Sequence, residues 1–304
     1  MLPTRNRNRF SLCWQLPVLP LNQIQGGKTG VEMAMQRRFW ASLTNLLAQW
    51  IVWHRETETR FGSGLFVLDT AHGYQKSMID NIKKLRSMYG KKINIVAGNV
   101  ITEDATRDLI LAWADVVKVG IWAWAMCTTR MKTAVGRPQF TAVYKCAKEA
   151  KKHGWVIWAD AWVRSPRDFI LALAAWASHV MWGTRWAGTF ESVGDVKYDE
   201  QWLMYKENYG MASKKAVWNR SQSLSKFQQA QKQMFREGIS SSRIYIKPGM
   251  ESVGDIVDEC MTGLRSAMTY LGAKNLQEFS EKAVVWVQTS AWFVEGTPHG
   301  KVRK

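Results

Sequence analysis

The chain has 304 residues, of which 46% are hydrophobic and 22% are charged, and its formal net charge is +17. This composition is typical of a soluble globular protein, and a chain of this length can bury a large core. No run of about 18 apolar residues occurs, so we expect no transmembrane helix.

The distribution of basic residues and of cysteines excludes further classes. Lysines and arginines are spread along the chain and do not alternate with aromatic residues in one basic run. We therefore expect a surface that attracts anionic ligands and no nucleic-acid partner. The cysteines are far apart and form no CxxC pair, as in a cytoplasmic protein with reduced thiols; they are Cys13, Cys127, Cys146 and Cys260. The histidines have no metal-ligand spacing, so we expect no zinc site.

Strands and helices alternate from residue 64 onward, whereas residues 1–63 contain no convincing strand–helix unit. Short apolar runs predict strands, and periodic apolar positions predict helices. Thr102 and Ser165 are expected N-caps, and Gly154 is expected to close a helix. The expected strands lie in residues 64–69, 92–100, 115–121, 155–160 and 179–184, and the expected helices in residues 77–90, 102–114, 138–154 and 165–177.

This alternation predicts a parallel sheet covered by helices. Polar and glycine residues follow each expected strand, which favours a (β/α)8 TIM barrel with its active site at those strand ends. A doubly wound sheet is the alternative, but no glycine-rich loop follows the first strand. About three further strand–helix units are needed for a complete barrel, so we expect an incomplete or divergent N-terminal part in residues 1–63 and a catalytic domain in residues 64–304.

Cys127 is the first candidate for chemistry. It lies in a loop after an expected strand and is followed by Thr128, Thr129 and Arg130. A thiol in such a loop is a nucleophile when its pKa is lowered, and an inert cysteine is the alternative interpretation.

Several motifs occur in one order around Cys127, namely "VLDTAHG", "NIVAGNV", "VVKVGI" with "CTTR", "VGRPQFTAV", "AGTFES" and "YKENYGMAS". Together they resemble the IMP dehydrogenase / GMP reductase family over residues 64 to 296. The resemblance implies a (β/α)8 barrel, assembled as a homotetramer, that binds a purine nucleotide and uses NADPH or NAD.

The resemblance also implies the roles of individual residues. The family nucleophile, which forms a thioimidate with the purine, corresponds to Cys127, and the family's proton-transfer groups correspond to Thr129 and Glu191. The substrate-binding positions correspond to Asp160 for the ribose, to Gly183 and Thr184 for the phosphate, and to Tyr209, Gly210, Met211 and Ser213 for phosphate and base. The cofactor side corresponds to Asp69, Thr70 and Asn99. The carbonyl of Cys127 corresponds to a K⁺ ligand.

The choice between the two family activities depends on the flap, about residues 214–245. IMP dehydrogenases carry an adjacent Arg-Tyr there, whereas in this chain Arg220 is followed by Ser221. No sequence for regulatory CBS modules is seen. The similarity is greatest to an actinobacterial-type GMP reductase, and the alternatives are an IMP dehydrogenase and a catalytically impaired remnant that still binds a nucleotide or a partner subunit.

Tryptophan occupies many positions where this family has glycine. They are Trp113, Trp122, Trp124, Trp162, Trp176, Trp286 and Trp292. One hypothesis is that UGA codons, which some bacteria read as glycine, have been translated as tryptophan; the other is a decayed or altered gene. Recoding does not explain Ala123, which replaces the family proline, or Ala134 and Ala161, which replace glycines.

Overall fold

The computed structural model describes residues 64–121, 126–161, 163–222, 224–233, 238–296, 298 and 300. Its centre is a five-stranded sheet in which every neighbouring pair is parallel and the strand order is β1-β2-β3-β4-β5. All five expected strands therefore form. Their bounds are Leu65–Asp69 for β1, Asn94–Val100 for β2, Val116–Val119 for β3, Val156–Asp160 for β4 and His179–Met181 for β5.

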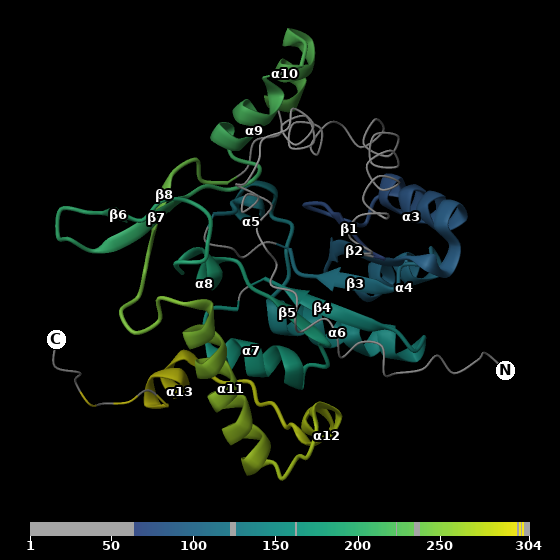
Figure 1. Cartoon of the computed structure of the whole chain (residues 1–304). Coiled ribbons are helices and arrows are strands. Elements are labelled where there is room, and N and C mark those ends of the chain that lie inside the picture. Colours follow the sequence, from purple (N-terminus) through teal and green to yellow (C-terminus); the bar gives the residue numbers. More distant parts are fainter. Residues whose placement is uncertain are drawn as a thin grey trace.

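The helices between these strands cover one face of the sheet (Figure 1). They are α3 (Lys76–Tyr89), α4 (Glu103–Leu111), α6 (Gln139–Lys152) and α7 (Pro166–Ala174). The 3₁₀ turn η3 (Gly90–Lys92) follows α3, and the short helices α5 (Thr129–Thr133) and α8 (Thr184–Ala187) follow β3 and β5. The strand order follows the chain without reversal, as in a curled half of a TIM barrel, and does not fit the doubly wound alternative. The five strands are five of the eight that a closed barrel needs.

The helix starts follow the capping residues in the sequence. The Thr102 hydroxyl accepts a hydrogen bond from the Ala105 N–H at 3.3 Å, and Ser165 accepts one from the Asp168 N–H at 3.3 Å. Pro166 is the first residue of α7. Both predicted N-caps are confirmed, and each satisfies one of the N–H groups that a helix start leaves without an internal partner.

A second sheet lies beside the first, and the sequence analysis did not predict it. It is antiparallel, with the order β6-β7-β8. The expected flap region contains α9, α10 and β8, and α9 and α10 project at the top of the view in Figure 1. The bounds are Lys197–Tyr198 for β6, Met204–Asn208 for β7, Ser242–Tyr245 for β8, Lys214–Ser221 for α9 and Lys226–Gln233 for α10.

Among the described residues, three helices follow β8 and lie at the bottom of the view in Figure 1. They are α11 (Val253–Tyr270), α12 (Leu276–Lys282) and α13 (Ser290–Glu295). Cys260 and Leu264 of α11 and Phe279 of α12 share a buried cluster with Phe169 and Leu173 of α7. No helix within the described part of the chain is long and apolar enough to cross a membrane.

Four helices end in the same hydrogen-bonded turn, and tryptophan stands in two of them. An N–H bonds the carbonyl five residues earlier at 3.0 Å after α4 and α6, 3.1 Å after α7 and 2.9 Å after α11. The residue just before that N–H has a left-handed backbone in every case. Its φ is +77° at Trp113, +73° at Gly154, +69° at Trp176 and +58° at Gly272. This is the Schellman turn, whose left-handed position favours glycine.

The other tryptophans at family glycine positions differ among themselves. Trp292 lies inside α13, and neither it nor Trp286 has a positive φ, so the backbone accommodates both without strain. Trp122, Trp124 and Trp162 lie outside the described residues. A positive φ also occurs at Trp202 (+60°), where no glycine was expected, and at Ala134 (+59°) and Ala161 (+148°), where glycine was.

Candidate active site

A buried lysine joins the carboxyl ends of the parallel strands. Lys118 of β3 is fully buried, and its ammonium donates to Asp69 Oδ1 of β1 at 2.9 Å and to Asp160 Oδ2 of β4. Burial by itself lowers the pKa of Lys118, but the Asp160 and Asp69 carboxylates outweigh burial, so the pKa lies above the ordinary lysine value. The amine therefore stays charged and holds both predicted site carboxylates.

Asn99, at the end of β2, belongs to the same cluster. Its side-chain N–H donates to Asp160 Oδ2 at 3.0 Å and to the Gly120 carbonyl at 2.6 Å. Two acceptors of the cluster, Asn99 Oδ1 and Asp160 Oδ1, are buried and have no hydrogen-bond partner within the described part of the chain. Buried acceptors of this kind suit N–H and O–H donors of a ligand.

Close backbone contacts hold the ends of these strands together. Gly120 has φ +139°, and a Cβ at this position would lie 2.0 Å from the Asp160 carbonyl oxygen. Thr70 donates from its N–H to the Gly98 carbonyl at 2.9 Å, and its hydroxyl donates to the same oxygen at 3.2 Å. The predicted cofactor-side residues Asp69, Thr70 and Asn99 therefore lie together beside Asp160.

The candidate nucleophile lies in the loop of residues 126–129, called here the nucleophile loop. Cys127 is partly exposed, and its Sγ lies 3.1 Å from the Thr129 hydroxyl. Thr129 is the first residue of α5 and is buried. The structure thus brings together the predicted nucleophile and one of its two predicted proton-transfer partners.

The two other described cysteines have a different environment. Cys146 of α6 and Cys260 of α11 are buried, and burial raises the pKa of each thiol to about 11. Both thiols are therefore protonated near neutral pH and are poor nucleophiles. Cys13 lies outside the described residues.

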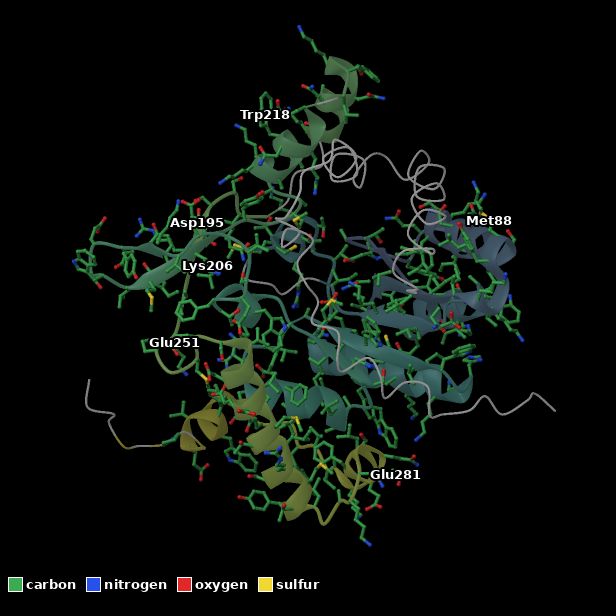
Figure 2. The ribbon with its side chains drawn as sticks, in the orientation of Figure 1. Met88, Asp195, Lys206, Trp218, Glu251 and Glu281 are labelled. Carbon is green, nitrogen blue, oxygen red and sulfur yellow. The ribbon has the colours of Figure 1, made fainter. Side chains whose placement is uncertain are left out.

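Glu191 lies in the loop between α8 and β6, which is held from two sides. Lys206 of β7, labelled in Figure 2, donates its ammonium to the carbonyls of Phe190 and Ser192, the two neighbours of Glu191. Glu191 Oε1 accepts a hydrogen bond from the Val253 N–H at the start of α11 at 3.0 Å. Its carboxylate therefore also stabilises the first turn of α11.

The residues predicted to bind the phosphate and the base follow β5 and β7. Gly183 precedes α8 directly and Thr184 begins it. The nucleotide loop, defined here as residues 209–213, follows β7; Met211 is half-exposed in it, and the Tyr209 ring lies 4.8 Å from Lys215 Nζ. The Ser213 hydroxyl is buried and accepts a hydrogen bond from the Ala216 N–H at 3.3 Å, so it caps α9.

The possible K⁺ site includes backbone that lies outside the described residues. The resemblance implies, from IMP dehydrogenases, cation ligands that are carbonyls of the loop that holds Trp122 and Trp124, together with the Cys127 carbonyl. Within the described residues, no group of three or more His, Cys, Asp or Glu side chains is placed to hold a metal ion.

Lys118 is the main site residue that the sequence analysis missed. It lies in the apolar run "VVKV", which was expected to form a buried strand. A lysine in a buried strand needs a compensating negative charge. This requirement alone could have predicted that Lys118 pairs with carboxylates at the strand ends.

The sequence is similar to a family model and to several curated proteins. A family model described as "IMP dehydrogenase / GMP reductase domain" matches residues 55–299. The chain is 50% identical over 237 residues to proteins named GMP reductase from Mycobacterium tuberculosis and Mycobacterium bovis, which is 78% of this chain and 49% of theirs. It is 42% identical over 235 residues to a protein named inosine-5'-monophosphate dehydrogenase from Bacillus subtilis, which is 77% of this chain and 47% of that one. The chain thus spans about half the length of these curated relatives.

Proposed function

The chain belongs to the IMP dehydrogenase / GMP reductase family, and we propose that it is a GMP reductase, which converts GMP and NADPH into IMP, ammonia and NADP⁺. The observation that carries the proposal is the pairing of Cys127 with Thr129, 3.1 Å apart, in a chain 50% identical to proteins named GMP reductase. The matched relatives named inosine-5'-monophosphate dehydrogenase are 41–42% identical.

Cys127 acts as the nucleophile in the proposed reaction. Its sulfur bonds to C2 of the purine while the 2-amino group leaves as ammonia, which gives a thioimidate. Thr129 and Glu191 move the proton that the departing amine needs. Hydride then adds to C2, the carbon–sulfur bond breaks, and the electron pair returns to the sulfur as IMP forms.

In this proposal the ligands are held by the strand-end cluster, which consists of Asp69, Asn99, Lys118 and Asp160. The buried Asp160 Oδ1, which has no partner among the described residues, is an acceptor suited to a ribose hydroxyl. The Asn99 Oδ1 atom, buried in the same way, is suited to an amide N–H such as that of a nicotinamide carboxamide. Bound NADPH would supply the hydride. Lys118 and Asn99 keep Asp160 oriented by hydrogen bonds to its other oxygen.

IMP dehydrogenase is the second candidate, because the family contains both activities and the chain also resembles proteins of that name. It is disfavoured by the flap sequence. The water-activating Arg-Tyr of that activity is replaced here by Arg220 and Ser221, both within α9.

The test supplies purified protein with GMP and NADPH in one reaction and with IMP and NAD⁺ in another. We expect GMP-dependent oxidation of NADPH, with ammonia and IMP in equal amounts, and no turnover of IMP with NAD⁺. Cys127→Ala is the control for the covalent step. Turnover of only the second pair identifies an IMP dehydrogenase. No turnover of either, with GMP still bound, identifies a catalytically impaired member of the family.

A further inference from the structure

Three segments that are far apart in the sequence meet at the nucleophile loop. The Met126 carbonyl accepts a hydrogen bond from the Ile239 N–H at 2.8 Å. The Thr128 hydroxyl accepts one from the Gly238 N–H at 2.8 Å. The Ile239 carbonyl in turn accepts a hydrogen bond from the N–H of Gly210 in the nucleotide loop at 2.9 Å. Cys127 therefore lies between two residues that are each bonded to residues 238–239.

Glycine is required at position 238, where these segments cross. Gly238 has φ +96°, and a Cβ at this position would lie 2.8 Å from the Met126 carbonyl oxygen. At Gly210 a Cβ would lie 3.1 Å from the same oxygen and 3.4 Å from the Gly238 Cα. A side chain at Gly238 would therefore strain the backbone and also push the Met126 carbonyl away.

A side-chain contact reinforces the crossing. The Ser242 hydroxyl, at the start of β8, lies 3.0 Å from Met126 Sδ and 3.2 Å from the Asn208 carbonyl at the end of β7. Asn208 and Ser242 are also paired in the β7–β8 register. The nucleophile loop is thus anchored to the antiparallel sheet from which the nucleotide loop emerges.

We propose that Thr128 and Gly238 are positioning residues that hold Cys127 at a fixed place relative to the nucleotide loop. The inference rests on the proposed function for its consequence, because a nucleotide held by residues 209–213 must present C2 to the Cys127 sulfur. The reason is geometric: displacement of a reacting group by about 1 Å can lower the rate by as much as about 100-fold. The hydrogen bonds of Met126 and Thr128, on either side of Cys127, restrict its main chain. The Cys127 Sγ therefore stays beside the Thr129 hydroxyl.

The test compares Thr128→Val, which removes the acceptor, with Thr128→Ser, which keeps it. Thr141→Val, at an exposed position of α6, is the matched control. Two quantities are measured on folded protein: kcat and KM for GMP, and the rate at which iodoacetamide alkylates Cys127, read by peptide mass spectrometry. The buried Cys146 and Cys260 serve as internal references in the same digest.

We expect the two readouts to move in opposite directions. Thr128→Val should lower kcat about tenfold or more with a smaller change in KM, because the displaced thiol is out of line. In the same variant, iodoacetamide should alkylate Cys127 severalfold faster, because the nucleophile loop has lost its hydrogen bond to Gly238. Thr128→Ser and Thr141→Val should resemble the unmodified protein in both. Gly238→Ala should act like Thr128→Val.

Alkylation separates this inference from the proposed function, since it needs no turnover. If no variant and no parent protein turns over GMP, the proposed function fails, while faster alkylation in Thr128→Val still supports the positioning role. Unchanged alkylation of Cys127 and unchanged kcat in Thr128→Val overturn the inference. Equal losses in Thr128→Val and Thr128→Ser also overturn it, because they show that the hydroxyl acceptor is not the relevant group.

Discussion

Trp113 and Trp176 occupy the same position of the same turn, one residue beyond the C-caps of α4 and α7, and both have a left-handed backbone. Glycine has this position in the matching turns after α6 and α11, at Gly154 and Gly272. A left-handed conformation costs a residue with a Cβ roughly 1–2 kcal/mol, and glycine does not pay this cost. The backbone conformation thus independently supports the interpretation, made from the sequence, that Trp113 and Trp176 stand at glycine positions.

Replacement of Trp113 by glycine should stabilise the protein. We expect a gain of about 1 kcal/mol, or a rise in Tm of about 2–4 °C. The gain at Trp176 should be smaller, because Lys151 Nζ lies 3.5 Å from the centre of its ring and that contact is lost. Differential scanning calorimetry of the two variants measures both.

Two further variants serve as controls for this prediction. Trp292→Gly lies inside α13, where glycine should lower stability by up to about 1 kcal/mol. Gly154→Ala places a Cβ in a left-handed turn and should also destabilise. A rise in Tm for Trp292→Gly as large as that for Trp113→Gly would show that backbone conformation is not the cause.

Reversion of the site tryptophans should restore nucleotide binding. Trp122, Trp124 and Trp162 lie outside the described residues, so this prediction stays one from sequence. A glycine N–H approaches a phosphate closely, and we expect the indole of Trp162 to obstruct that approach. We expect Trp122 and Trp124 to obstruct the turn that presents Cys127. We expect the triple glycine variant to bind GMP more tightly than the unmodified chain in a thermal-shift titration. Equal affinity would mean that the site tolerates these indoles.

The codons distinguish the two origins of the tryptophans. If UGA has been translated as tryptophan, then Trp113, Trp176 and the site tryptophans are encoded by UGA. UGG at these positions removes the recoding hypothesis and leaves a decayed or altered gene. Recoding does not account for the left-handed Ala134 and Ala161.

Cys127 should be the only described cysteine needed for turnover. Cys127→Ala should abolish conversion of GMP, whereas Cys146→Ala and Cys260→Ala should keep most of it when rates are normalised to folded protein. The buried thiols have pKa values raised to about 11, so their thiolates appear only as the pH approaches that value. Alkylation of Cys146 and Cys260 should therefore stay slow between pH 7 and about 9. Residual turnover in Cys127→Ala argues against a covalent mechanism.

Lys118→Met should destabilise the fold strongly. It leaves the Asp160 carboxylate buried without its cation, at a cost of about 3–5 kcal/mol. The pKa of Lys118 is higher in the folded state than its unfolded value of about 10.4, so its contribution is fully present below that pH and is lost as the pH rises through the folded-state value. Urea unfolding should show a constant difference from the unmodified protein between pH 7 and about 9, which shrinks at higher pH.

The Lys118→Met/Asp160→Asn double variant is the control for this pair. It removes both charges and should recover part of the loss, since the buried carboxylate is gone. The free energies of unfolding of Lys118→Met, Asp160→Asn and the double variant are compared. If the loss in the double variant equals the sum of the losses in the two single variants, the ion pair is not the source of the effect.

Thr129 and Glu191 should act as one proton-transfer unit. Thr129→Val and Glu191→Gln should each slow ammonia release by about 10²–10⁴-fold with little effect on GMP binding, and the double variant should lose little more than the worse single one. Glutamine retains an oxygen that can accept the Val253 N–H, so the change tests proton transfer and preserves the start of α11. Fully additive losses in rapid-quench measurements would mean that the two residues act independently.

The sequence was a sufficient guide to the parallel sheet but not to the structure around residues 197–245. The strands β1 to β5 are short apolar runs between amphipathic helices, and Thr102 and Ser165 mark the helix starts. By contrast, β6 has two residues and β7 includes the buried Lys206, so no apolar alternation reveals the antiparallel sheet. Periodicity also cannot show that Thr128 bonds Gly238, because that contact joins residues 110 positions apart.

The single amine of Lys118 is shared by Asp69 and Asp160, on the predicted cofactor side and the predicted nucleotide side. A ligand that bonds to Asp160 therefore alters the field that holds Asp69, and the reverse is also true. Such coupling is reciprocal by thermodynamic linkage, so each ligand must change the affinity of the other by the same factor. Should GMP and a nicotinamide cofactor bind as proposed, the shared amine of Lys118 would couple the two sites, and the ratio of GMP affinities with and without cofactor measures that coupling.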